Sequence, residues 1–277
     1  MLKLRSYLPL FIAVFLCSCY SPRYIYSPSA ANVPVLNHKG DSKLALYYSG
    51  SSFGRKEEKF FYNYGFDAEV AYAMNKHWAI LFNKYNRYEK NSGDFDALRL
   101  DSAVIIYKRS VTEIGGGYFT PFFDSSHLSF QFMGGLGIGK FSMHDNGKDA
   151  ANQYYSRYHE VGITKAFLQP ALQVRYSKYF TTSFAARFSI LWYHGIKTNY
   201  TAAEQESFLL NELTQSPKTF WEPAVINSFS LKKLPAYRFE LQFDFASLVS
   251  SRFVDYRSVN VSIGAMVDLS KLKKGHK

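Results

Sequence analysis

The sequence predicts an all-β fold, an antiparallel up-and-down transmembrane β-barrel of about ten strands. Three observations lead to this fold class. Aromatic residues make up 18% of the 277 residues, yet the mean hydropathy is only −0.20. Apolar residues recur at every second position over long segments, and the connections between these segments are alternately short and long. A barrel in lipid explains all three, because only every second residue of its strands faces the lipid.

The first 18 residues have the layout of a secretory targeting peptide. Lys3 and Arg5 supply the positive charge, and an apolar run from Leu8 to Leu16 follows. A membrane-spanning helix needs roughly 20 apolar residues, so this run is too short to span, and the sequence contains no other stretch of the kind. We therefore expect residues 1–18 to be a signal peptide.

Cys17 and Cys19 are the only two cysteines of the sequence. The small residue Ser18 before Cys19, with Leu16 further upstream, resembles the lipobox of bacterial lipoproteins. Cys17 fits this motif less well because bulky Leu16 directly precedes it. We expect lipid attachment, such as palmitate, at Cys19. The alternative is ordinary cleavage nearby that leaves Cys19 unmodified.

The remaining chain divides into three parts. Residues 19–40 show no sustained periodicity, which predicts an extended, lipidated N-terminal tether. The barrel is expected at 41–270, and a basic tail at 271–277. The net charge is +11, including two charges from Lys3 and Arg5. Because an exported chain rarely meets nucleic acid, we expect outer-membrane lipids and lipopolysaccharide as partners, and no nucleic acid.

The strands are predicted from alternation with a period of two. Between Leu128 and Ile138, large apolar residues alternate with small or polar ones. After Tyr237 the intervening residues include the charged Arg238 and Glu240. A membrane barrel turns its aromatic face to lipid and its charged face to the lumen, the inverse of a soluble sheet. About ten such segments are expected, at 42–53, 62–73, 77–88, 110–122, 127–141, 162–176, 180–193, 219–231, 236–248 and 258–269.

The connections indicate the orientation of the barrel. Those near residues 75, 125, 178 and 233 are short, whereas those at 54–61, 89–109, 142–161, 194–218 and 249–257 are longer or more polar. Outer-membrane barrels have short periplasmic turns, long extracellular loops and an even strand number that returns both termini to the periplasm. A lipid anchor would then lie in the inner leaflet. Eight strands are the alternative, and the stretch 96–109 could extend the fourth strand outward.

The same register collects charged side chains of both signs in the lumen. The predicted lumen charge network consists of Asp67, Glu69, Glu113, Arg175, Arg187, Glu222, Arg238, Glu240 and Asp244. Buried charges must be paired and hydrogen-bonded to be tolerated, so a salt-bridged, filled lumen is the main prediction. A narrow selective channel is the alternative.

Candidate catalytic groups are His144-Asp145, His159-Glu160 and His194, all near expected outer strand ends. Adjacent residues of a strand point to opposite faces, so sequence adjacency does not bring a histidine and its acid together. We expect no enzymatic activity, with a membrane protease or lipid A hydrolase as the alternative. No spacing typical of metal ligands occurs, and no cofactor is expected.

Several short motifs resemble the predicted outer-membrane β-barrel lipoproteins of Bacteroidota, and the resemblance extends over nearly the whole chain from Cys19. They are Cys19-Tyr20-Ser21-Pro22, Tyr26-Ser27-Pro28, Asn32-Val33-Pro34-Val35-Leu36, Lys39-Gly40-Asp41, Glu113-Ile114-Gly115-Gly116-Gly117-Tyr118, Glu222-Pro223-Ala224 and Val261-Ser262-Ile263-Gly264. The resemblance implies a membrane barrel and no particular activity. Lipoproteins that such bacteria export to the surface typically carry acidic residues after the cysteine. Here Tyr20-Ser21-Pro22-Arg23 follows, which favours an inner-leaflet anchor.

Three classes of function are consistent with these features. The first is a structural or interaction component of the bacterial outer membrane, with a protein complex of that membrane as a further expected partner. The second is a narrow channel or transport component, and the third is the barrel enzyme. Loops carry specificity on a rigid scaffold, so partner selection is expected in the loops 89–109 and 194–218.

Overall fold

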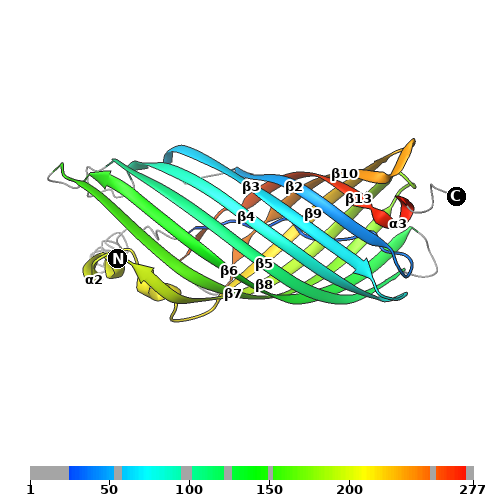
Figure 1. Ribbon diagram of the computed structural model, residues 1–277, viewed down its shortest axis with the longest axis horizontal. Helices are drawn as coiled ribbons and strands as arrows, with labels where there is room; N and C mark the ends of the chain where they lie inside the picture. The colour runs from blue at the N-terminus through cyan, green and yellow to red at the C-terminus, as the bar shows by residue number, and fades with distance from the viewer. Residues whose placement is uncertain are drawn as a thin grey trace, which may run out of the picture.

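The computed structural model describes residues 25–52, 58–94, 102–121, 127–148, 152–249 and 254–272. Its body is a closed antiparallel barrel with steeply inclined strands (Figure 1). Each wall strand pairs with the next one along the chain, and the last wall strand pairs with the first. The ten wall strands are β2 (Ser42–Ser52), β3 (Glu58–Ala73), β4 (Trp78–Asp94), β5 (Ser102–Pro121), β6 (Leu128–Lys148), β7 (Tyr154–Arg175), β8 (Phe180–Thr198), β9 (Lys218–Leu231), β10 (Leu234–Phe245) and β13 (Val259–Asp268).

The smaller elements lie at the two ends of the barrel. At the end with the long connections are β11 (Ser247–Leu248), the helix α2 (Ala202–Ser207) and the 3-10 helix η2 (Leu210–Leu213). At the same end β1 (Ile25–Tyr26) pairs in parallel with β12 (Asp255–Tyr256). The short helix α3 (Leu269–Leu272) lies at the opposite, short-turn end (Figure 1). Across the described ranges, no helix is both long and apolar enough to cross a membrane.

The predicted fold class is confirmed, because every predicted segment falls on a different wall strand and the ring closes with ten strands rather than eight. The predicted strand ends agree closely at the short-turn end. At the other end β3 to β8 are several residues longer than predicted, whereas β2, β10 and β13 end within three residues of the prediction. β5 already begins at Ser102, as the alternative of an extended fourth strand allowed, and β7 begins at Tyr154, within a stretch that we expected to be a loop.

The outer surface of the barrel carries a belt of exposed apolar side chains. On β6 the outward-facing Phe132, Leu136 and Ile138 are 45%, 63% and 70% exposed. The run from Leu128 to Ile138 rises by about 25 Å along the barrel axis, at ~3.3 Å per residue and a strand tilt of roughly 40°. That height matches the apolar band of membrane barrels, whereas water would disfavour so large an apolar surface.

The interior changes character along the axis. Beside the belt the lumen is lined by charged and amide side chains. Towards the long-connection end it is filled by a buried apolar cluster that includes Tyr107, Phe141, Met143, Ile163 and Tyr193. In this outer part the strands therefore resemble a soluble barrel, with apolar residues inside and polar residues outside.

Candidate functional site: a lumen filled by the N-terminal segment

The most distinctive feature of the lumen is a stretch of the chain's own N-terminal region. Residues 25–34 are all buried, and so is Leu36. Only Ile25 and Tyr26 belong to a strand, and the rest is extended chain without sheet partners. The sequence analysis predicts a tether here, and no pattern in these residues indicates that they lie inside the barrel. We refer to residues 25–36 as the luminal segment.

Side chains of the barrel wall form hydrogen bonds with the backbone N–H and carbonyl groups of the luminal segment. Buried backbone groups need hydrogen-bond partners, and a segment that contains Pro28 and Pro34 cannot form a regular ladder. Side chains from β3, β5, β6, β7 and β10 provide the partners instead. These bonds are Ala30 N–H to Asp67 Oδ2 (3.1 Å), Ala31 N–H to Gln242 Oε1 (3.0 Å), Gln169 Nε2 to Asn32 O (2.9 Å), Gln131 Nε2 to Pro34 O (2.6 Å) and Arg109 Nη2 to Ser27 O.

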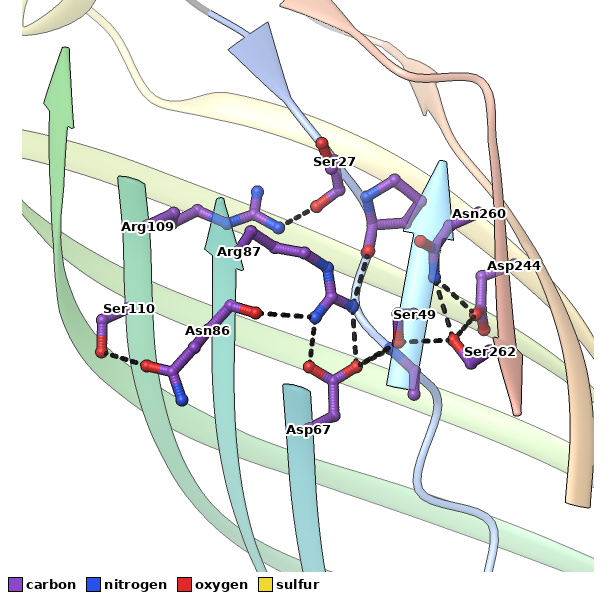
Figure 2. A network of polar contacts seen from close by, with 12 residues as sticks. Ser27, Ser49, Asp67, Asn86, Arg87, Arg109, Ser110, Asp244, Asn260 and Ser262 are labelled. Carbon is purple, nitrogen blue, oxygen red and sulfur yellow. Dashed lines mark hydrogen bonds and ion pairs between the residues drawn. The ribbon is translucent and has the colours of Figure 1, made fainter. Parts of the chain in front are cut away.

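Asp67 and Arg87 form the centre of this arrangement (Figure 2). The Arg87 guanidinium binds both carboxylate oxygens of Asp67, with 2.7 Å between Nη2 and Oδ2. Arg87 also donates to the carbonyl of Pro28 at 3.3 Å. Gly65 makes room for the arginine, because a Cβ at that position would lie 2.6 Å from Arg87 Cδ. This ion pair therefore links two wall strands to the luminal segment.

A second cluster joins β2, β3 and β10. The Lys43 ammonium lies 2.9 Å from Glu69 Oε2 and 3.4 Å from Glu240 Oε2. The Tyr47 hydroxyl donates to Glu240. All of these side chains are almost completely buried.

A third cluster lies across β5, β7, β8 and β9. The Lys165 ammonium is 3.0 Å from Glu113 Oε1 and 3.9 Å from Glu222 Oε2. Arg187 is 3.7 Å from Glu113 Oε2 and donates to Gln169. The Tyr26 hydroxyl of the luminal segment donates to Glu222 Oε1 at 2.5 Å. Two of the three clusters thus include contacts to the N-terminal segment.

The structure places the other predicted network residues in different surroundings. Asp244 accepts hydrogen bonds from Asn260 and Ser262, close to the Asp67 site (Figure 2). Arg238 is buried and donates to Ser228 and Thr181. Arg175 is only half-buried at the short-turn end, where it donates to the Asn37 side chain. Arg175 therefore belongs to the rim of the lumen and not to its interior.

The sequence analysis did not include Lys43, Arg87 and Lys165, which supply most of the positive charge of these clusters. Lys165 lies on the same predicted face as Arg175, whereas no charged face was predicted for the strands of Lys43 and Arg87. It also missed the buried pair of Glu89 and Arg257, in which Nε and Oε1 are 3.1 Å apart. Arg257 comes from a long connection, so no strand pattern could have identified it.

The long connection between β8 and β9 covers the mouth of the barrel at the long-connection end. Tyr200, Phe208, Leu210 and Leu213 from this connection are buried in the apolar cluster. α2 begins with a capping box in which Thr201 and Glu204 exchange hydrogen bonds. Partial burial alone would raise the pKa of Glu204, but the hydrogen bonds from Thr201 and the charge of Arg157 hold this pKa below its usual value. The capping box stabilises the first turn of α2. We refer to residues 200–213 of this connection as the lid.

Each of the two adjacent candidate pairs is divided between the two faces of its strand. His144 and Asp145 point to opposite faces, and buried Asp145 accepts from the hydroxyl of Tyr200 at 2.9 Å. His159 is buried, whereas Glu160 and His194 are exposed. The described residues contain no group of three His, Cys, Asp or Glu side chains that could hold a metal ion. Cys19 and residues 273–277 lie outside the described residues, so the signal peptide, lipidation and most of the basic tail stay predictions.

A polar patch interrupts the apolar outer face of β4, β5 and β6. It contains Lys84, Lys108 and Lys140, and Lys140 follows Ile138, the last outward-facing apolar residue of the belt on β6. Lys84 donates to Thr112 at 3.0 Å, and Ser110 donates to Asn86 at 2.9 Å. A groove of about 360 Å³ is lined by Lys108 and Lys140 together with Tyr64, Phe66 and Tyr88. We refer to Lys84, Lys108 and Lys140 with this groove as the lysine patch.

No protein-family model and no curated protein matches this chain. Solved membrane barrels are similar to it in architecture. The translocator domain of the autotransporter NalP from Neisseria meningitidis is 11% identical over 83% of this chain and 89% of that one, with a TM-score of 0.48. The outer membrane protease OmpT from Escherichia coli is 8% identical over 84% and 94%, with a TM-score of 0.43. Ail, the attachment invasion locus protein of Yersinia pestis, is 12% identical over 83% and 97%, with a TM-score of 0.29. Such distant likeness carries no activity or partner over to this chain.

Proposed function

We propose that this protein is a closed, non-conducting outer-membrane barrel that serves as a structural or interaction component of the bacterial outer membrane. The observation that carries the proposal is the occupied lumen. The luminal segment fills the space beside the belt, and the buried apolar cluster fills the outer part. The wall carboxylates that a channel would offer to passing ions are instead engaged with arginine, lysine, the backbone of the segment or, for Asp244, neighbouring amide and hydroxyl groups.

The proposed orientation places the long connections and the lid outside the cell and the short turns in the periplasm. It rests on the rule that outer-membrane barrels have short periplasmic turns. The belt runs close to the short-turn end, so β5, β6 and β7 extend well beyond it at the opposite end. This projecting part, with its lid, presents a rigid surface that is suited to a protein partner.

We propose lipopolysaccharide as a partner of the lysine patch. The patch lies where the belt ends on the outward side, which is the level of the outer-leaflet headgroups in this orientation. Lysines at that level attract the phosphates of lipid A, and the neighbouring rings of Tyr64 and Phe66 offer an apolar wall to an acyl chain.

Conductance of the purified protein in planar bilayers tests the closed state. We expect no discrete current steps from the full-length protein. A variant that lacks both residues 25–36 and residues 200–213 should show steps, because its lumen loses the segment beside the belt and the side chains of the connection that help to fill its other part. Discrete steps from the full-length protein would mean that the lumen is an open channel and would refute the proposal.

Lipid A binding tests the lysine patch. In the variant K84Q/K108Q/K140Q we expect about 100-fold weaker binding, since each lysine near a charged membrane surface contributes about 1 kcal/mol. The matched control is K178Q/K232Q/K233Q, which removes the same charge from exposed positions at the short turns. Titration of detergent-solubilised protein with lipid A gives the affinities. Equal losses in both variants would show a non-specific charge effect and contradict the assignment.

A further inference from the structure

The luminal segment runs from one end of the barrel to the other. Its C-terminal end, Leu36, packs against Ala73, Ala79 and Phe119 near the short turns. Its N-terminal end pairs with β12, which lies in the long connection between β10 and β13. The Arg257 N–H donates to the carbonyl of Tyr26 at 2.7 Å. The chain therefore enters β2 from the short-turn end, whereas Ile25, the first described residue, lies at the long-connection end.

The distance between these two ends limits where the preceding residues can lie. Ser27 accepts from Arg109, which is a dozen residues along β5 from Pro121. At ~3.3 Å per residue and a tilt of roughly 40°, this contact lies about 30 Å from the short-turn end. Five residues lie between Cys19 and Ile25, and these six residue steps span only about 20 Å even when the chain is fully extended.

We infer that the chain crosses the membrane inside its own barrel, so that the residues before Ile25 lie on the cell-surface side. The inference rests on the orientation that we proposed for the barrel. An acyl chain on Cys19 would then insert into the outer leaflet. This inference replaces the expected periplasmic N-terminus and inner-leaflet anchor, because that expectation assumed that residues 19–40 stay on the side where β2 begins.

The wall strands end at different heights along the barrel axis. This difference favours an exit of the N-terminal chain at the level of the outer leaflet. β2, β10 and β13 end close to the outer limit of the belt, whereas β5, β6 and β7 project beyond it. β12, with the paired Ile25 and Tyr26, lies in the connection between β10 and β13, on the low side of the rim. A lipid attached within about 20 Å of Ile25 can reach the outer-leaflet headgroups there.

Epitope tags on intact cells test the inference. One tag is inserted between Arg23 and Tyr24, and matched tags are placed after Glu206 in the lid and after Lys277. An antibody that cannot cross the outer membrane should label the first two tags on intact cells, and the third only after permeabilisation. If the antibody labels the Glu206 tag on intact cells but not the Arg23 tag, the chain does not cross the membrane inside its barrel and the inference is wrong. A labelled Lys277 tag with a silent Glu206 tag instead shows an inverted barrel, so the proposed orientation itself fails.

Proteolysis of the untagged protein provides a second measurement that needs no variant. Proteinase K should digest the purified, folded protein up to about Ile25, while residues 25–36 stay protected and bound to the barrel. Mass spectrometry of the digested particle identifies the retained peptide. Rapid loss of residues 25–36 from an otherwise intact barrel would show that the segment is not inside the lumen and would overturn the inference.

Discussion

Asp67→Asn is the substitution that tests the lumen most directly. Asparagine keeps the shape of the side chain but removes the negative charge that binds Arg87. In the folded protein Asp67 is 1% exposed, and it accepts hydrogen bonds from Arg87, from the Ala30 backbone and from Ser49. The substitution therefore leaves a guanidinium that is only 9% exposed without its counter-ion.

The expected cost follows from that burial. Removing one partner of a buried ion pair typically costs about 3–5 kcal/mol, because the other charge stays buried without compensation. The amide oxygen of the introduced asparagine would still accept one hydrogen bond, so we expect D67N to lower the free energy of unfolding by about 3 kcal/mol. The double variant D67N/R87Q removes both charges. It should be more stable than the sum of the single effects predicts, by at least ~1.5 kcal/mol.

Urea unfolding from lipid vesicles measures these values. The three tryptophans are suitable reporters, because Trp78, Trp192 and Trp221 all face outward and are 51%, 40% and 43% exposed. Glu160→Gln, at an exposed position, is the control and should change the free energy by less than about 0.5 kcal/mol. The reasoning is wrong if D67N is as stable as this control, or if the effects of D67N and R87Q simply add.

Two further predictions concern the belt and the lid. Ile263→Lys places a charge in the middle of the lipid-facing row of β13 and should destabilise the barrel by about 2–4 kcal/mol, whereas Leu231→Lys at the end of β9 should cost about 1 kcal/mol or less. The same urea assay distinguishes them, and equal costs would contradict the position of the belt. Because the pKa of Glu204 is depressed, its stabilisation of α2 is present above the unfolded value of about 4.3 and is lost as the pH falls through the folded value. After correction for the intrinsic exchange rate at each pH, the protection of the α2 amides should fall in acid, E204A should show low protection at all pH values, and E206A should match the unchanged protein. High protection in E204A would mean that packing alone holds the lid.

The sequence was sufficient to predict the strands where they cross the belt. There the outward residues are apolar and the inward ones polar, as on β10, and this alternation persists for the whole crossing. Beyond the belt the pattern reverses. On β5, Ile105 and Tyr107 point inward and Lys108 points outward. In the sequence, this exchange of the apolar and polar faces resembles the end of a strand. For this reason the extension of β5 was only an alternative in the sequence, and those of β6 and β7 were not predicted.

The place of the luminal segment could not be predicted, because the barrel binds it largely through its backbone. The carbonyls of Ser27 and Asn32 and the N–H groups of Ala30 and Ala31 are contacts that almost any residue could make. Such contacts leave no periodicity in the sequence. The charged wall residues were predicted in part, because alternation identifies the face of a strand but not the partner across the lumen.

The luminal segment also bears on the order of events as the barrel assembles. The segment directly precedes β2, and the ring is completed only when β13 pairs with β2 from Lys43 to Ser52. Until those last hydrogen bonds form, the seam between the first and last strands is open along its length. The segment can therefore move sideways into place against β3, β5 and β7 while the wall is still an open sheet. Closure of the seam would then trap an already bound chain, so that no extended peptide has to be pulled lengthwise through a finished pore.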